Sequence, residues 1–380
     1  MAQPTKNPLA RLPDLGQSIW FDYIRRDMVQ DGTLARLIAT DELRGMTSNP
    51  TIFAQAIAGS TLYDGDIRAA AATATNEQIF ETLAIADIRA ACDVFRPVYD
   101  KTKGLDGYVS LEVSPKLARD TAGTTKDAAR LWKAVDRPNL MIKIPGTQEG
   151  LPAIEASLAA GINVNVTLLF SVERYREVMD AWLRALEARA AKGLAVDRIA
   201  SVASFFVSRV DTNVDKAIDA ALKTAAAPLA SRLTAAKSTL AIANARLAYQ
   251  AYLDAIARHP RFAALKAKGA MPQRALWAST STKSKTLPDV LYVEALIGKD
   301  TVNTVPPATY DAYRDHGDPA DRVTDDLAAA KAAFQLLKDA GIDFAAITRE
   351  LEIDGVKKFA ESFDELLASI QTKRAAIASR

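Results

Sequence analysis

Short apolar runs alternate along most of this 380-residue chain with longer stretches in which apolar residues recur every three or four positions. Runs that are closed by Gly, Pro or hydroxyl-bearing residues predict strands, and the periodic stretches predict amphipathic helices. We expect helices at about residues 24–39, 67–74, 77–99, 126–135, 151–160 and from 171 onward. We expect strands at about residues 18–23, 43–50 (running into a turn), 108–113, 140–144, 162–168, 199–207, 274–279 and 301–305.

Two segments depart from this alternation. From about residue 214 to 268 the sequence has helical periodicity without a strand pattern, which predicts a helical insertion. From about residue 322, two or three amphipathic helices are expected to close the chain. The chain is therefore expected to divide into an N-terminal tail (1–15), a region of strands and helices with the insertion (16–320), and C-terminal helices (321–380).

The number and order of the expected strands define a fold class. Eight strands that alternate with helices predict βαβ units, a parallel sheet and, at this number, a closed barrel. The expected fold is α/β: a single (β/α)8 TIM barrel with a helical insertion and C-terminal helices. In such barrels, the loops at the C-terminal ends of the strands form the active site.

One charged residue lies inside the apolar run 140–144. Lys143 shares a face of the expected strand with Met141, and Ile142 and Ile144 occupy the other face. An unpaired buried ammonium is costly, so Lys143 must find a carboxylate or lose its proton. A deprotonated lysine is a nucleophile that can form a Schiff base with a carbonyl carbon. A structural ion pair at the barrel rim would explain the same residue, and this run alone leaves both explanations open.

Polar side chains also stand near the C-terminal ends of the other expected strands. In a closed barrel these ends meet at one mouth, so the side chains are expected to converge there with Lys143. Asp22 and Glu112 can serve as acid–base groups, or they can simply pair with Lys143 or with a rim arginine. The positions are Asp22, Asn49, Glu112, Asn165, Thr167, Ser204 and Ser279.

The composition narrows the possible functions. The formal net charge is +2, which gives no general attraction to nucleic acid or to a membrane surface, and no run is long enough for a membrane span. The two histidines, His259 and His316, lie beside turns, which disfavours a Ser-His-Asp triad or a His-rich metal site. No Gly-rich nucleotide-binding motif is present. The single cysteine, Cys92, and the lack of an apolar signal region in residues 1–16 lead us to expect a cytoplasmic protein.

Six short segments resemble the motifs of transaldolases, in the same order along the chain. They are TSNPT (47–51), SLEV (110–113), MIKIP (141–145), NVTLLFS (165–171), SFFVSR (204–209) and LYVE (291–294). The resemblance also covers NTVPP (303–307) and GVKKF (355–359), so it extends over essentially the whole chain. The long helical insertion is similar to that of the longer bacterial transaldolase subgroup.

This resemblance implies the transfer of a dihydroxyacetone unit between sugar phosphates. Sedoheptulose 7-phosphate and glyceraldehyde 3-phosphate would give erythrose 4-phosphate and fructose 6-phosphate, in the non-oxidative pentose phosphate pathway. It implies neither a metal nor an organic cofactor, because the protonated imine is itself the electron sink. A Schiff-base fructose 6-phosphate aldolase and a non-catalytic sugar-phosphate-binding barrel remain open alternatives. A monomer or a homodimer is expected.

The matching motifs assign roles by resemblance. Lys143 would form the imine with C2 of the ketose, and Asp22 would act as the acid–base group for the C4 hydroxyl. Glu112 would shuttle protons through a water molecule that Thr167 orients. The residues that would hold the three-carbon unit are Asn49, Asn165 and Ser204.

Three further residues concern the phosphate and the choice of reaction. Arg209 matches the family's phosphate-binding arginine. Compact family members carry a second arginine after the seventh strand, where this chain has Lys283 in a Ser/Thr-rich loop. Lys283 is either a substitute phosphate ligand or a solvated loop lysine. Phe206 stands where transaldolases carry Phe and fructose 6-phosphate aldolases tend to carry Tyr, and a ring without a hydroxyl is expected to favour transfer over simple cleavage.

Overall fold

The computed structural model describes residues 7–284 and 286–378. Within these residues, eight parallel strands pair with their sequence neighbours, and β8 pairs with β1 to close a barrel. This confirms the expected (β/α)8 barrel. The strands are β1 (Gln17–Asp22), β2 (Gly45–Thr47), β3 (Tyr108–Glu112), β4 (Leu140–Pro145), β5 (Val164–Leu169), β6 (Ser201–Phe206), β7 (Arg274–Ala278) and β8 (Thr301–Val305).

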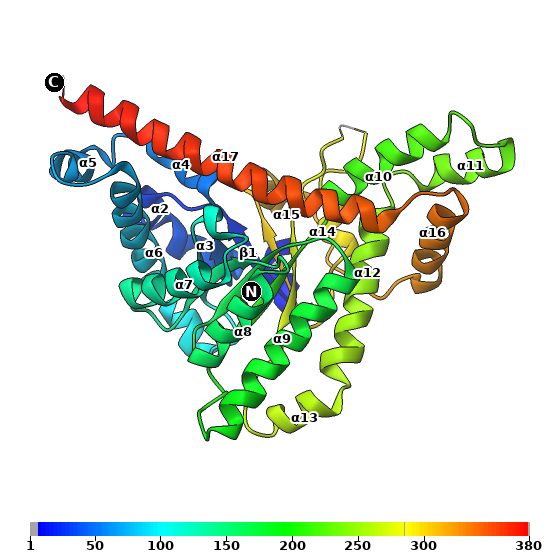
Figure 1. The fold of residues 1–380 in the computed structure, drawn as a ribbon, viewed down its shortest axis with the longest axis horizontal. Coiled ribbons are helices and arrows are strands. Elements are labelled where there is room, and N and C mark those ends of the chain that lie inside the picture. Colours follow the sequence, from blue (N-terminus) through cyan, green and yellow to red (C-terminus); the bar gives the residue numbers. More distant parts are fainter. Residues whose placement is uncertain (1–6, 285, 379–380) are drawn as a thin grey trace, which may run out of the picture.

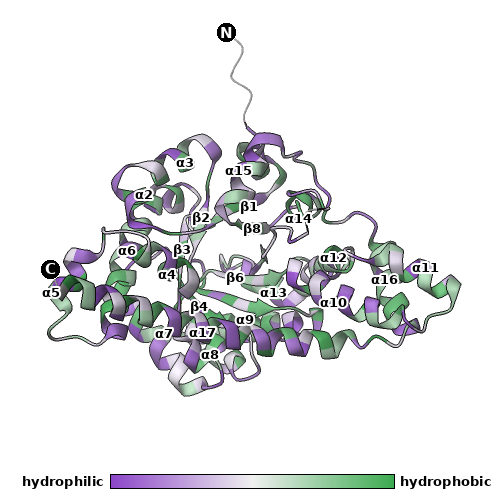
Figure 2. Ribbon diagram, turned by 90° about the horizontal axis from the view of Figure 1, so that it is seen from above, coloured by the Kyte–Doolittle hydropathy of each residue, from purple (hydrophilic) through white to green (hydrophobic). Residues whose placement is uncertain are grey.

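Helices surround the barrel, as seen in Figure 1 and, from above, in Figure 2. Among the described residues, none of them is long and apolar enough to cross a membrane. They are α1 (Pro8–Arg11), η1 (Leu12–Leu15), α2 (Arg26–Gln30), α3 (Thr33–Asp41), α4 (Pro50–Ala58), α5 (Asp64–Ala70), α6 (Asn76–Lys101), η2 (Pro115–Leu117), α7 (Thr121–Val135), α8 (Gly150–Ala160), α9 (Val172–Ala191), α10 (Ser208–Ala221), α11 (Ala227–Ala236), α12 (Leu240–Tyr252), η3 (Leu253–Ala257), α13 (Pro260–Lys266), α14 (Leu291–Ala295), α15 (Pro307–His316), α16 (Leu327–Asp339) and α17 (Phe344–Ala378).

The strands are buried on both faces, because the helical layer covers the outside of the barrel and side chains fill its inside. Every residue of β4, β5, β6, β7 and β8 is buried. Trp20, Trp182 and Trp277 are fully buried in the same core. Burial on both faces explains why most of these strands read as continuous apolar runs, and why a charged residue such as Lys143 stands out in the sequence.

The helix expected over residues 24–39 is divided into α2 and α3. Gly32 lies between the two and has a φ of 78°, in the left-handed region that glycine adopts without the penalty of a Cβ atom. The amide nitrogen of Thr33 donates to the carboxylate of Asp31 at 2.8 Å, which satisfies one donor at the start of α3. The apolar periodicity continues across the break, so it predicted a single helix.

The segment expected as a tail over residues 1–15 is ordered where the structure describes it, and residues 1–6 lie outside the described residues. Asn7 caps α1 by accepting a hydrogen bond from the Ala10 amide at 3.1 Å. Leu9 and Leu12 are fully buried, and α1 contacts α3 and α15. A helix of four residues is too short to show a periodic pattern, so it could not be predicted from the sequence.

The insertion and α16 lie beside the barrel, whereas α17 crosses it. The segment 214–268 contains α11, α12, η3 and α13, whereas α10 begins at Ser208, directly after β6. α11 and α16 contact each other away from the barrel. The last helix, α17, runs across the molecule from the side of α16 to the side of α5 (Figure 1) and contacts α4, α10 and β5 on its way. The C-terminal end of the chain therefore passes over the mouth of the barrel.

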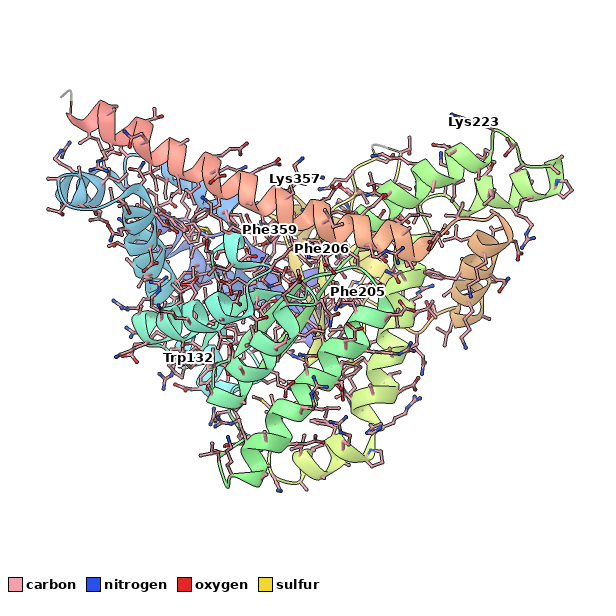
Figure 3. The ribbon with its side chains drawn as sticks, in the orientation of Figure 1. Trp132, Phe205, Phe206, Lys223, Lys357 and Phe359 are labelled. Carbon is pink, nitrogen blue, oxygen red and sulfur yellow. The ribbon has the colours of Figure 1, made fainter. Side chains whose placement is uncertain are left out.

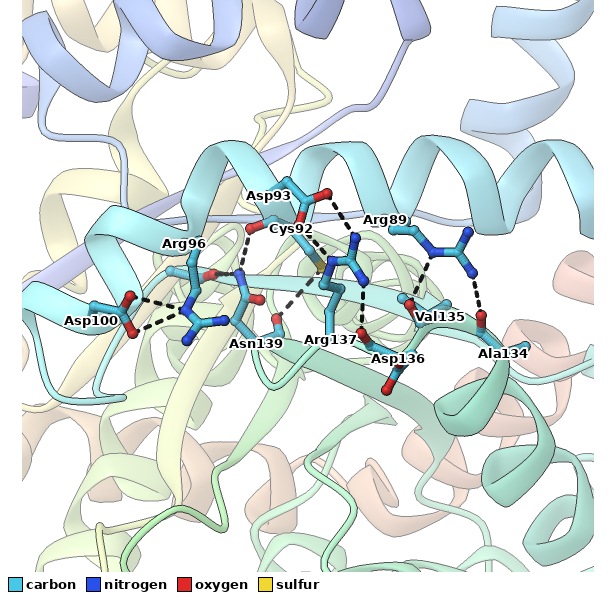
Figure 4. A network of polar contacts seen from close by, with 11 residues as sticks. Arg89, Cys92, Asp93, Arg96, Asp100, Ala134, Val135, Asp136, Arg137 and Asn139 are labelled. Carbon is cyan, nitrogen blue, oxygen red and sulfur yellow. Dashed lines mark hydrogen bonds and ion pairs between the residues drawn. The ribbon is translucent and has the colours of Figure 1, made fainter.

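The strand that carries Lys143 is tied to the neighbouring helix α6. The Asn139 amide, directly before β4, donates to the backbone oxygens of Cys92 and Gly107 at 2.8 Å each. Around this buried contact lies an exposed ion pair between Arg137 and Asp93 (Figure 4). These buried hydrogen bonds fix the start of β4, and thereby the position of Lys143 along the barrel axis.

A buried ionic cluster closes the opposite end of the barrel. Asp106 accepts hydrogen bonds from Arg274 at 2.8 Å and from the Ser18 hydroxyl at 2.9 Å, and Arg274 also donates to Ser18 at 2.8 Å. Both charged side chains are at most 5% exposed. Since these residues precede β3, begin β7 and belong to β1, the cluster links three strands at their N-terminal ends.

We expect Asp106→Ala to lower the free energy of unfolding by about 3–5 kcal/mol, because it leaves Arg274 buried and unpaired. The matched control Asp93→Ala removes a carboxylate whose side chain is 54% exposed and should cost about 0.2–1 kcal/mol. Urea denaturation of both variants measures the difference. Equal losses in the two variants would contradict the importance of the buried cluster.

Candidate active site

A cavity of about 220 Å³ lies at the C-terminal ends of the strands. Eight of the ten residues predicted for the site line it, and the other two, Glu112 and Asn165, contact residues of its wall. The predicted convergence of polar side chains on one mouth is therefore observed. The lining residues are Asp22, Thr47, Asn49, Lys143, Thr167, Ser204, Phe206, Arg209, Ala278, Ser279, Ser281, Lys283, Thr304, Pro306 and Phe359.

Lys143 projects into this cavity from β4 and is only 6% exposed. Its Nζ donates to the backbone oxygen of Ser48 at 3.2 Å and lies 3.7 Å from Glu112 Oε2. Lys143 is in register with Glu112 of β3 on one side and with Asn165 of β5 on the other. Register in the parallel barrel thus places the amine between a carboxylate and an amide.

Asp22 reaches the same cavity from the end of β1. Its Oδ1 accepts a hydrogen bond from the Thr47 hydroxyl at 2.6 Å, and this hydroxyl lies 2.7 Å from that of Thr304 on β8. Burial raises the pKa of Asp22, and the nearby charge of Lys143 and the Thr47 hydrogen bond partly oppose this rise. The hydroxyl pair orients the carboxylate, and the raised pKa makes it a better proton acceptor than an exposed aspartate.

Glu112 differs from Asp22 in its hydrogen bonding. Both of its carboxylate oxygens are buried and accept no hydrogen bond within the described part of the chain. Burial raises its pKa to about 7; the charge of Lys143 lowers it and that of Asp22 raises it further. The Thr167 hydroxyl on β5 is likewise buried with no hydrogen-bond partner among the described residues. A carboxyl that titrates near neutral pH can both take up and release a proton there.

The amide side chains differ in their positions. Asn165 is fully buried, donates to the Ser110 hydroxyl at 3.1 Å and accepts from the Ser204 hydroxyl at 2.7 Å. It supports Ser204, which lines the cavity. Asn49 caps α4 by accepting from the Ile52 amide at 3.0 Å, and its NH₂ group is the part that can donate to a ligand.

Two cations and a phenyl ring also line the cavity. The guanidinium of Arg209 lies 5.1 Å from the centre of the Phe206 ring, which also packs against Phe170 at 5.2 Å. Burial lowers the pKa of Arg209. Lys283 donates to the Ser281 hydroxyl at 2.9 Å, and burial together with the charge of Arg209 lowers its pKa. Both cations line the same cavity, and the charge of Arg209 acts on Lys283, so an anionic group bound there would stabilise both.

Several residues of the site were not predicted. Thr47 and Thr304 orient Asp22. Thr47 belongs to the TSNPT motif and Thr304 to an expected strand, but neither pattern indicates this role. Phe359 comes from α17, where its ring centre lies 5.6 Å from Lys143 Nζ. An aromatic residue in an amphipathic helix carries no signal that separates it from ordinary core packing.

The described residues contain no group of three or more His, Cys, Asp or Glu side chains that could hold a metal ion. The cavity instead brings together one amine, two carboxylates, hydroxyls and two further cations. Such a set can form an imine, move protons around it and bind an anionic substituent of the same substrate.

Comparison with known proteins agrees with this chemistry. Residues 19–370 match the protein family described as Transaldolase/Fructose-6-phosphate aldolase. The chain is 49% identical over 371 residues to Transaldolase of Trichodesmium erythraeum, which covers 97% of each chain. It is 49% identical over 372 residues to Transaldolase of Thermobifida fusca, covering 97% of this chain and 99% of that protein. It is 48% identical over 372 residues to Transaldolase 2 of Nostoc sp., with 97% of each chain covered.

The raised pKa of Glu112 predicts a dependence of stability on pH. Between about pH 4.5 and 7 the folded state holds a proton that the unfolded state has released, so the stability contributed by Glu112 falls as the pH rises. Glu112→Gln removes this dependence. As the pH rises through this window, the free energy of unfolding of the variant should increase relative to that of the original protein, by on the order of 3 kcal/mol in total. Denaturant unfolding at a series of pH values measures it; parallel curves for the two proteins would refute the assignment.

Proposed function

Because this chain belongs to the transaldolase/fructose-6-phosphate aldolase family, we propose that it transfers a dihydroxyacetone unit from sedoheptulose 7-phosphate to glyceraldehyde 3-phosphate through a Schiff base on Lys143. The products are erythrose 4-phosphate and fructose 6-phosphate, as in the non-oxidative pentose phosphate pathway. The observation that carries the proposal is the buried Lys143 amine, which lies 3.7 Å from Glu112 in a cavity shared with Asp22.

Imine formation needs a proton acceptor and a proton donor next to the amine. The neutral amine adds to C2 of the ketose, and the resulting carbinolamine then loses its hydroxyl as water to leave a protonated imine. Glu112 supports both proton transfers because its pKa is about 7. The distance of 3.7 Å to Nζ is longer than a direct hydrogen bond, which fits transfer through one water molecule that Thr167 also holds.

Cleavage of the C3–C4 bond is assigned to Asp22. Its carboxylate takes the proton of the C4 hydroxyl, the aldose phosphate leaves, and the bond's electron pair moves into the imine to give an enamine. The Thr47 hydroxyl fixes the accepting carboxylate at 2.6 Å. In the second half of the cycle Asp22 returns the proton as the enamine adds to the acceptor aldehyde. Asn49, Asn165 and Ser204 hold the three-carbon unit meanwhile.

Phe206 supports transfer rather than simple cleavage. Its ring is held between Phe170 and the Arg209 guanidinium and faces the cavity. A phenyl ring offers no hydroxyl to orient a water molecule toward the enamine, so the intermediate persists until an aldehyde arrives. The three ionisable groups buried around the imine position disfavour a silent sugar-phosphate-binding barrel, because such burial is costly without a chemical use.

We also propose that the enzyme acts in the cytoplasm, as a monomer or a homodimer. Cys92 supports the compartment, because it is a buried free thiol in α6 and burial raises its pKa. Size-exclusion chromatography with light scattering determines the number of subunits, and a tetramer or a larger assembly would be incompatible with this proposal.

A coupled assay tests the transferase reaction. With fructose 6-phosphate and erythrose 4-phosphate, the enzyme should release glyceraldehyde 3-phosphate continuously; without the acceptor, release should stop after about one turnover. Lys143→Met should lower transfer by at least about 10³-fold, because the nucleophile is lost. Lys357→Met, on the exposed face of α17, is the control and should leave the rate unchanged. Sustained release without an acceptor would instead identify an aldolase.

The two cations predict a selective effect on phosphorylated substrates. Arg209→Ala should raise KM for glyceraldehyde 3-phosphate about 10- to 100-fold, because charge-assisted hydrogen bonds to phosphate are lost. Lys283→Ala should have the smaller effect, since Lys283 is more exposed. Rates with an unphosphorylated donor and acceptor, fructose and glyceraldehyde, should change little, and the exposed Arg232→Ala serves as control. An equal loss with the phosphorylated and the unphosphorylated pair would mean that Arg209 acts on the fold rather than on phosphate.

A further inference from the structure

The C-terminal helix α17 presents one face to the barrel. Its buried or partly buried positions recur every three or four residues, whereas Lys357 and Lys358 are exposed on the other side. Figure 3 shows Phe359 next to Phe206 beneath the helix, with Lys357 on its outer side. The inner face comprises Leu351, Gly355, Phe359, Phe363, Leu366 and Ile370.

A glycine brings this face close to the mouth of the barrel. A Cβ atom on Gly355 would lie 2.9 Å from Leu168 Cδ2, closer than such atoms approach in proteins. Leu168 itself, near the end of β5, has a φ of 61°. Gly355 precedes Phe359 by one helical turn, so the close approach to β5 places the Phe359 ring low over the cavity.

Contacts on both sides of Phe359 hold the helix in this position. Glu352 lies 3.7 Å from Arg174 of α9, before the ring. After the ring, Ser362 accepts a hydrogen bond from Thr51 of α4 at 2.9 Å, and Asp364 pairs with Lys116 at 2.8 Å. The ring is therefore fixed by contacts with elements from both halves of the barrel.

The position of the ring suits a positive charge on the Lys143 nitrogen. Nζ lies 5.6 Å from the ring centre, within the range in which the negative face of an aromatic ring attracts a cation. The carboxylates of Glu112 and Asp22 lose their charge whenever they accept a proton in the reaction. The ring does not titrate, so its attraction persists through every protonation state of its neighbours.

We propose that Phe359 is a further active-site residue, which stabilises the protonated imine on Lys143 through the face of its ring. The inference rests on the proposed function, because that function supplies the imine. The cation forms when the amine, the ketone carbonyl and a proton combine with loss of water, and its charge stays on the same nitrogen that faces the ring. Phe359 should thus favour the protonated imine over the free amine and over the neutral imine.

Borohydride trapping with fructose 6-phosphate tests this role. Phe359→Leu keeps an apolar side chain but loses the ring, and it should require about 2- to 30-fold more fructose 6-phosphate for half-maximal trapping. The alkaline limit of trapping should also move to lower pH, by up to about 1.5 units, because the imine is a weaker base without the ring. Phe359→Trp retains an aromatic face and should preserve both values.

Phe363→Leu is the matched control. Its ring lies on the same face of α17, 5.6 Å from Lys116 Nζ, and it does not line the reactive cavity. In this variant the sugar concentration for half-maximal trapping and the alkaline limit of trapping should equal those of the original enzyme, even if its melting temperature falls. If Phe359→Leu fails to fold, Phe359→Met provides the same loss of the ring.

The outcomes separate the two proposals. The absence of any adduct in the original enzyme would overturn the proposed function and this inference with it. If Phe359→Leu forms the adduct with the same half-maximal sugar concentration and the same alkaline limit as the original enzyme, the role of the ring is overturned and the proposed function stands. Equal impairment of Phe359→Leu and Phe359→Trp would also overturn it, because it would show that the side chain acts through packing.

Discussion

The structure depends on keeping the amine of Lys143 buried inside the barrel. Lys143 is only 6% exposed, and an isolated charge at such a position would be costly. The cost is offset by Glu112 at 3.7 Å and by the Ser48 carbonyl at 3.2 Å, and the face of the Phe359 ring covers the same nitrogen. Each of these contacts comes from a different element, so the fold as a whole holds the amine in place.

Strand register and hydrogen bonding place the two carboxyl groups in different surroundings. Glu112 stands beside Lys143 on the neighbouring strand, has no hydrogen-bonding partner among the described residues, and titrates near pH 7. Asp22 reaches the cavity from β1 and is oriented by Thr47. Two carboxyl groups in unlike surroundings can serve separate proton transfers around one imine. The cations Arg209 and Lys283 line the same cavity, which suits a substrate that carries both a carbonyl group and a phosphate.

The barrel and most of the side chains that line the cavity could be predicted from the sequence, because both leave local patterns. A lysine inside an apolar run is conspicuous, and polar residues at the ends of strands must meet at one mouth once the sheet closes. The break at Gly32 was missed because apolar periodicity continues across it. Phe359 was missed because its role follows from the path of α17 over the barrel, and an amphipathic pattern shows which residues are apolar but not what they cover.

The central claim is that Lys143 captures the sugar covalently. The most direct measurement is peptide mapping by mass spectrometry after borohydride reduction of the enzyme in the presence of fructose 6-phosphate. We predict one reduced three-carbon or six-carbon adduct per chain, on the peptide that contains Lys143 and on no other lysine. An active enzyme that carries no adduct, or that carries it on a different lysine such as Lys283, would contradict the account.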